Sequence, residues 1–303
     1  MVISENQKGA MLILVGMLIL AIVDNYVRFV AQDIGLWQFH LMRSVVSVAL
    51  IYFYAVSVRR KLKPKNLRAV LLRTSFLVLA MFIYFGSLAF LPISQVAAGF
   101  FTSPIFVMVF SILFWREKIH FYRLFAIVCG SIGVVLVLGI NLNHITWLYF
   151  IPVLAGMFYA MSSILLRNWC SEEDAVSIML IFFLGMGIVG VFMICLLEVN
   201  TLFNIYQIPE SFLTANLKLP SINTIFIIFV HALGSILGGV LITLGYQKGE
   251  TSFVSIFEYS FLFFATTWAY LFFGELITLT IFIGMLLIFG SGYLLSLRGR
   301  EPS

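Results

Sequence analysis

The chain has 303 residues, of which 62% are hydrophobic and 10% are charged, and its mean hydropathy is +1.09. Soluble domains carry roughly a quarter charged residues and roughly half apolar ones. This composition therefore leaves too little polar surface to cover a water-exposed core. It excludes soluble enzymes, disordered chains and nucleic-acid-binding modules, and it indicates an all-α integral membrane protein.

The cysteines and the net charge give no sign of a cofactor or a metal. The three cysteines, Cys129, Cys170 and Cys195, show no CxxC or other metal-like spacing, so we expect neither a disulfide framework nor a zinc site. The formal net charge of +5 comes from 18 Lys and Arg against 13 Asp and Glu. In membrane proteins such an excess usually lies in cytoplasmic loops.

A membrane-spanning helix needs about 20 mostly apolar residues. Ten such stretches follow one another along the chain, and only 59–68 and 198–221 are longer connections, so no soluble domain is expected. The predicted spans are 9–32, 36–58, 69–91, 94–115, 121–140, 145–166, 176–197, 222–246, 251–273 and 277–297.

The basic residues set the predicted orientation. If the N-terminus is cytoplasmic, the inner side holds every Lys and Arg, Arg73 included, except Lys218 in an outer loop and Arg28 and Arg43 within spans. Such a bias is typical of cytoplasmic loops. We expect both termini in the cytoplasm.

Ten spans divide into two halves of five, predicted as residues 1–142 and 143–303. Because five is odd, the second half enters the membrane from the opposite side, so any similarity between the halves is an inverted repeat. An offset of 158 residues aligns SQVAAGFFTSPIFVMVFSILFWREKI, which starts at Ser94, with SFVSIFEYSFLFFATTWAYLFFGELI, which starts at Ser252. Inverted repeats are typical of secondary transporters, whose substrate site lies near the midplane between the repeats.

Three stretches also resemble a known family. YFGSLAFLPISQVAAGFFTSPIFVMVFSILFWREKI, AGMFYAMSSILLRNW and FVSIFEYSFLFFATTWAYLFFGELI are similar to the EamA-type branch of the drug/metabolite transporter superfamily. The resemblance implies ten helices in two inverted five-helix repeats around a central cavity, in a bacterial inner membrane. It implies transport of a small organic metabolite without fixing which one, and family members include both exporters and importers.

Charged side chains at membrane depth are costly and usually face an interior cavity. Asp24, Arg28 and Arg43 lie near the outer ends of the first two spans, with Asp24 and Arg28 four residues apart on one predicted helical face. We expect them to neutralise one another, either as a structural cluster or as a substrate-facing gate.

Two titratable groups lie deeper. Glu258 is about two turns from the inner end of the ninth span, which suits proton coupling or recognition of a cationic group, while a packing role with Ser255 or Tyr259 is the alternative. His231, in the middle of the eighth span, is either a helix–helix hydrogen-bonding residue or a second coupling group.

Aromatic side chains near these positions could wall a site for an organic substrate, although simple packing is the alternative for each. The candidates are Trp37, Phe39, Phe100, Tyr159, Tyr259 and Trp268. Pro104 should kink the fourth span, because proline lacks a backbone donor, and Gly234 and Gly238 form a GxxxG step that permits close helix approach. We expect hinges at these three positions.

No Walker loop, HExxH or Ser/His/Asp arrangement appears, so an enzyme is not expected. The first hypothesis is a proton-coupled or exchange-driven secondary transporter, a monomer or homodimer in the lipid bilayer. It would carry a small organic substrate, such as an amino acid, an amino-acid derivative, a vitamin or a nucleoside-like cofactor. A non-transporting membrane scaffold or receptor is the alternative, and a channel has less support because no span carries a continuous polar face.

Overall fold

The computed structural model describes residues 4–88, 90–91, 93–116, 120–139, 147–203 and 211–298. Over these residues it contains ten helical segments that are long and apolar enough to cross a membrane, and their bounds lie within a few residues of the predicted spans. The expected all-helical, ten-span fold is therefore confirmed. The boundary proposed between residues 142 and 143 lies outside the described residues and stays a prediction.

The first five spans form the first repeat. The first span is α1 with the short α2, and the fourth is α5 followed by α6. The bounds are α1 Glu5–Asn25, α2 Val27–Val30, α3 Leu36–Ser57, α4 Leu67–Ser87, α5 Ile93–Phe100, α6 Ser103–Trp115 and α7 Phe121–Leu138.

The second repeat has the same order of spans. A 3₁₀ turn, Trp147–Tyr149, leads into α8, and another, Ser255–Tyr259, separates α11 from α12. The bounds are α8 Phe150–Trp169, α9 Ala175–Phe203, α10 Ile222–Lys248, α11 Thr251–Val254, α12 Ser260–Phe273 and α13 Leu279–Arg298.

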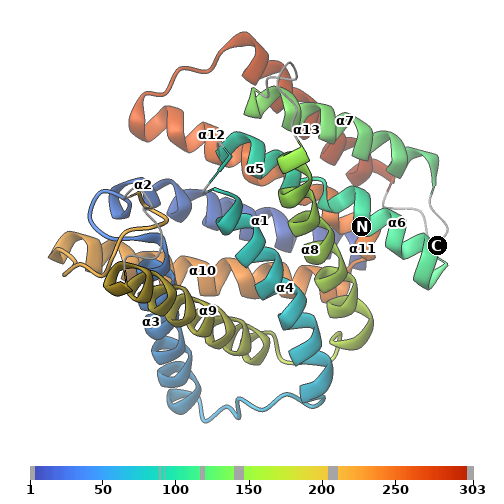
Figure 1. Ribbon diagram of the computed structural model, residues 1–303. Helices are drawn as coiled ribbons and strands as arrows, with labels where there is room; N and C mark the ends of the chain where they lie inside the picture. The colour runs from blue at the N-terminus through green and yellow to red at the C-terminus, as the bar shows by residue number, and fades with distance from the viewer. Residues whose placement is uncertain are drawn as a thin grey trace.

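Helix pairing in the bundle follows the inverted repeat. The most extensive contacts join α1 to α10, α4 to α8, α3 to α9 and α7 to α13, segments far apart in sequence that lie side by side (Figure 1). In each half, the first helix packs against the third helix of the other half, while the second and fifth helices pair with their own counterparts. This pattern maps onto itself when the two halves are exchanged.

Glycines permit the close approach of α1 and α10. A Cβ atom at Gly16 would lie 2.9 Å from the carbonyl oxygen of Gly238, and one at Gly234 would lie 2.5 Å from Cγ1 of Val23. Because α10 is continuous from Ile222 to Lys248, the helix does not break at the hinge expected at Gly234 and Gly238. The structure gives both glycines a packing role.

The fourth and ninth spans are both discontinuous. The fourth breaks after Phe100, and Pro104 lies in the first turn of α6, where a missing amide donor is tolerated, so the predicted interruption at Pro104 is present. The ninth span contains no proline, yet it tightens into the 3₁₀ turn that includes Glu258. With the offset of 158 residues, Phe100 and Glu258 are equivalent positions.

Candidate functional site

The first group of polar residues lies in the half of the bundle predicted to face the cytoplasm. Glu258, on the 3₁₀ turn, is 3% exposed and accepts a hydrogen bond from the hydroxyl of Tyr159 on α8. Tyr246 on α10 is also buried and lies within electrostatic reach of Glu258 and Tyr159. Its hydroxyl lies near the carboxylate of Glu258.

Arg73 completes this group from the first repeat. Its side chain, on α4, is 6% exposed, and it lies within electrostatic reach of Tyr159 and Tyr246. The Nε and Nη1 atoms have no hydrogen-bond partner in the part of the chain that the structure describes. We call Arg73, Tyr159, Tyr246 and Glu258 the inner cluster.

Sequence reasoning missed the role of Arg73. It counted this residue with the basic residues of the inner loops, because Arg73 lies close to the predicted start of the third span. The helix begins earlier, at Leu67, which places Arg73 between one and two turns inside α4. The available signal was its position among apolar residues in LLRTSFLVLA, where a loop arginine is not expected.

A second group lies in the opposite half of the bundle. The carboxylate of Asp24 on α1 is 2.9 Å from Nε2 of His231 on α10, and Nδ1 of His231 is 3.0 Å from the hydroxyl of Ser235. A neutral His231 that donates from Nε2 to Asp24 accepts at Nδ1 from Ser235. His231 is buried, whereas the side chain of Asp24 is 43% exposed.

Arg43 and Phe39, both on α3, belong to the same group. The guanidinium of Arg43 lies 5.5 Å from the ring centroid of Phe39 and 5.8 Å from that of Phe183, a cation–π arrangement. Arg43 is within electrostatic reach of Asp24, and the Phe39 ring meets the His231 ring edge to face at 5.0 Å. We call Asp24, Phe39, Arg43 and His231 the outer cluster.

Arg28 does not join the outer cluster, so the expected triad is wrong on this point. The first span is interrupted at Tyr26, which places Arg28 on the short α2 rather than on the face of α1 that carries Asp24. Arg28 pairs instead with Glu275 at 2.7 Å and lies 4.1 Å from the ring centroid of Phe273.

The inverted repeat relates two contributions to each cluster, a residue from the first helix of one half and a basic residue from the third helix of the other half. Asp24, Phe39 and Arg43 come from the first half with His231 from the second, whereas the inner cluster takes Tyr159, Tyr246 and Glu258 from the second half with Arg73 from the first. The offset of 158 residues makes Arg73 the counterpart of His231. Each cluster therefore receives one basic side chain from the opposite half, at the same position of the third helix.

An aromatic side chain lies between the clusters. The ring centroid of Phe100 is 5.0 Å from that of Tyr159 in the inner cluster and 5.1 Å from that of Tyr84. Tyr84 on α4 is in turn within electrostatic reach of Asp24. Phe100 therefore lies at the break of the fourth span, in contact with Tyr159 of the inner cluster and with Tyr84.

The other predicted aromatic candidates contact different parts of the bundle. Trp37 packs in the outer half, 6.1 Å from the ring centroid of Phe82. The hydroxyl of Tyr259 is 3.0 Å from that of Ser131 on α7, so it points toward a peripheral helix rather than bonding Glu258. Trp268 stacks on Phe272 of its own helix. The packing interpretation fits Tyr259 and Trp268 better than a substrate wall.

A network of polar contacts joins the inner ends of the two halves. Arg123 on α7 donates to Glu250 and to the hydroxyl of Ser252. The side-chain amide of Gln247 donates to the carbonyl oxygens of Cys170 and Glu173, at 2.7 Å and 2.8 Å. We call this set of contacts the inner-end network.

The same network extends to the loop after α3. The Glu173 carboxylate accepts from the backbone amides of Lys65 and Asn66, at 2.7 Å and 2.6 Å. Burial raises the pKa of the nearby Cys170 thiol to about 11, so this thiol stays protonated at neutral pH. The inner-end network therefore links the two halves on the side of the bundle on which the inner cluster lies.

At the outer end, Asp33 joins the turn before α3 to the start of α10. Its carboxylate accepts a hydrogen bond of 2.7 Å from the backbone amide of Ser221. This hydrogen bond holds the pKa of Asp33 below its ordinary value.

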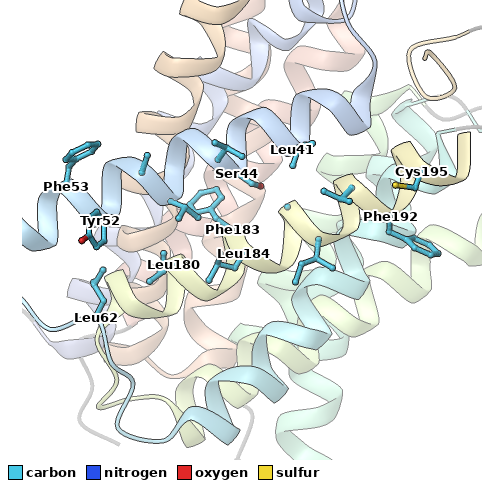
Figure 2. Close-up of a pocket in the computed structure, with 16 residues that line it drawn as sticks. Leu41, Ser44, Tyr52, Phe53, Leu62, Leu180, Phe183, Leu184, Phe192 and Cys195 are labelled. Atoms are coloured by element: carbon cyan, nitrogen blue, oxygen red, sulfur yellow. The ribbon is translucent and has the colours of Figure 1, made fainter. Parts of the chain in front are cut away.

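A large groove lies between α3 and α9, away from both clusters (Figure 2). Its volume is about 1060 Å³, and apolar side chains, among them Leu41, Phe53, Leu180 and Phe192, form nearly all of its surface. Phe183, which also lines the groove, lies under the guanidinium of Arg43. The groove is thus separated from the outer cluster by one aromatic ring.

Comparisons with known proteins point to transport. Residues 7–139 match the family model described as the EamA-like transporter family. The riboflavin transporter of Vibrio cholerae is 28% identical over 182 residues, a match that covers 58% of this chain and 61% of that protein. The chain thus spans less than two thirds of that relative's length.

Longer matches cover nearly the whole chain. The pseudopaline exporter of Pseudomonas aeruginosa is 22% identical over 294 residues, covering 95% of this chain and 96% of that protein. An uncharacterized transporter of Helicobacter pylori is 23% identical over 95% of this chain and 94% of its own. A crystal structure of a protein of unstated function has a TM-score of 0.79 at 12% identity and covers 99% of this chain and 100% of its own, which supports the fold alone.

Proposed function

We propose that this chain, whose residues 7–139 form an EamA-like transporter domain, is a secondary transporter that moves a small organic metabolite by alternating access. The ten apolar helices and the bacterial transporter relatives indicate a multi-pass protein of a bacterial inner membrane. The relatives point to transport rather than to an enzyme.

The observation that carries the proposal is the pair of polar clusters, one in each half of the bundle, which differ in accessibility. The acid of the outer cluster, Asp24, has a side chain that is 43% exposed, whereas the acid of the inner cluster, Glu258, is 3% exposed. The inner-end network lies on the buried side. This asymmetry fits a conformation open toward the outer side, and exchange of the two repeat conformations would open the inner side.

Glu258 is the proposed coupling or substrate-binding group. It lies on a 3₁₀ turn within a span, at a local departure from α-helical geometry, and binding residues of transporters commonly lie at such irregular points. The hydroxyl of Tyr159 supplies one hydrogen bond to its carboxylate, which leaves further acceptor capacity for a proton or an ammonium group of the solute.

The test is counterflow in proteoliposomes, with labelled riboflavin and a labelled amino-acid mixture as separate probes. A carrier exchanges labelled for unlabelled solute, whereas a channel or a scaffold does not. We expect Glu258→Gln to keep the fold, because the amide preserves size and hydrogen bonding, and to abolish the pH dependence of the initial rate around neutrality. The matched control is Glu172→Gln, at a side chain that is 85% exposed.

Two results would contradict parts of this proposal. Absence of counterflow with either probe at matched protein density would favour a scaffold or receptor. Identical pH profiles of the wild type and Glu258→Gln would remove Glu258 from the coupling mechanism and leave it a packing residue.

A further inference from the structure

Arg73 and its counterpart under the offset of 158 residues, His231, differ in their partners as well as in residue type. In the outer half, α10 packs along α1, and His231 of α10 is paired with Asp24 of α1. In the inner half, the equivalent pair of helices is α4 and α8. There Arg73 of α4 has Tyr159 of α8 beside it, and a tyrosine is not a counter-ion at neutral pH.

A buried guanidinium without partners is costly in a protein interior. Arg73 is 6% exposed, and its Nε and Nη1 atoms have no hydrogen-bond partner among the described residues. Arg123, which is equally buried, donates to Glu250 and Ser252 instead. The contrast between these two arginines singles out Arg73 as a cation that lacks an anion.

The surroundings of Arg73 also favour a ligand. The hydroxyls of Tyr246 and Tyr159 lie within electrostatic reach of both Arg73 and Glu258. Two fixed charges of opposite sign thus flank the two tyrosines, at the broken ninth span. Guanidinium binds carboxylate with paired hydrogen bonds, and a carboxylate binds ammonium.

We infer that Arg73 binds the carboxylate of an amphoteric solute, an amino acid or an amino-acid derivative, whose ammonium group faces Glu258. The solute's carboxylate would take the place that Asp24 occupies beside His231 in the outer cluster. This inference rests on the proposed function for the location of the site, and it names the substrate class of that site.

The first experiment uses the purified protein without added solute and compares thermal unfolding of two variants. Arg73→Met removes a charge without a partner and keeps the volume, so its Tm should equal or exceed that of the wild type. Arg123→Met leaves Glu250 without its ion-pair partner and should lower the Tm by several degrees. An Arg73→Met protein that loses as much stability as Arg123→Met would overturn the inference, because Arg73 would then be satisfied within the chain.

The second experiment measures the Tm with a mixture of the common amino acids and, separately, with a mixture of the amines formed by their decarboxylation. The amino acids should raise the Tm of the wild type but not that of Arg73→Met, and the amines should have little effect. Loss of the guanidinium should weaken apparent amino-acid affinity by about 10- to 100-fold. Equal effects of the two mixtures, or no effect of either on the wild type, would overturn the inference.

These outcomes separate the site from the transport function. Riboflavin carries no carboxylate, so riboflavin counterflow that survives in Arg73→Met, with no response to amino acids, would sustain the transporter and overturn the amphoteric substrate. An amino-acid response that depends on Arg73, without any counterflow, would sustain the binding site and contradict transport.

Discussion

Asp24 is half-exposed and paired with a buried histidine. The amide of Asn can still accept from Nε2 of His231, so Asp24→Asn can keep this hydrogen bond. Asp24 is also the acid nearest to Arg43 in the outer cluster, so its charge matters to any solute that enters there.

We therefore expect Asp24→Asn to fold with a yield close to that of the wild type, with a cost of at most about 1 kcal/mol. The initial rate of transport should fall, because the outer cluster would carry an uncompensated Arg43. Folded yield by size-exclusion chromatography and flux in proteoliposomes measure the two effects. A large drop in yield would instead support the purely structural interpretation of the cluster.

Asp33 predicts a defined pH dependence of stability. Because its pKa is lowered in the folded protein, its contribution is present above the unfolded pKa of about 3.9 and is lost as the pH falls through the lower, folded value. Asp33→Asn should thus unfold at a lower temperature than the wild type near neutral pH. The difference between the two melting temperatures should begin to shrink as the pH falls below about 4 and should vanish only below the folded pKa, and a constant difference at every pH would contradict the assignment.

For individual side chains, the contacts between different spans and the exact helix boundaries could not be predicted from the sequence. The depth of Glu258 was readable from hydropathy, but its partner Tyr159 comes from another span, and no local pattern links them. Arg28 was misplaced because a break at Tyr26 carries no proline or glycine to mark it. Arg73 was counted with the basic residues of the inner side, although it falls within the predicted span 69–91, because the start of a helix is uncertain by a few residues.

At the scale of helices, more of the structure could be predicted from the sequence than at the scale of residues. Apolar stretches of about 20 residues gave the ten spans, since the bilayer imposes this length on any chain. Pro104 marked the break in the fourth span. The break in the ninth span became visible only in the structure, because the segment Ser255–Tyr259 has no helix-breaking residue.

The contact between α1 and α10 depends on glycines. Substitution of a glycine by alanine, which adds one methyl group, tests this dependence. A Cβ atom at Gly16 would lie 2.9 Å from a backbone oxygen, whereas one at Gly290 on α13 would meet no atom within 4 Å. Gly16→Ala should destabilise the protein by about 1–3 kcal/mol, because backbone cannot move aside. Gly290→Ala should be neutral or stabilising by up to about 1 kcal/mol. Thermal unfolding in one detergent measures both, and equal Tm values would contradict the close packing.

For the whole molecule, the inverted repeat and the distribution of basic residues make one joint prediction about topology. Accessible tags at residue 303 and in the 59–68 loop should lie on the cytoplasmic side, and a tag near residue 210 should lie outside. Protease or maleimide accessibility in intact cells and in inverted vesicles measures each site. A cytoplasmic tag near residue 210 would contradict the predicted orientation of the second repeat.

The inner-end network has a consequence for how this protein can vary in evolution. Gln247 and Glu173 bond main-chain atoms of Cys170, Lys65 and Asn66, so those three positions can change their side chains without losing the contact. Gln247 and Glu173 themselves have no such freedom. Arg123 and Glu250 meet through their side chains, so among homologous chains substitutions at these two positions should occur together.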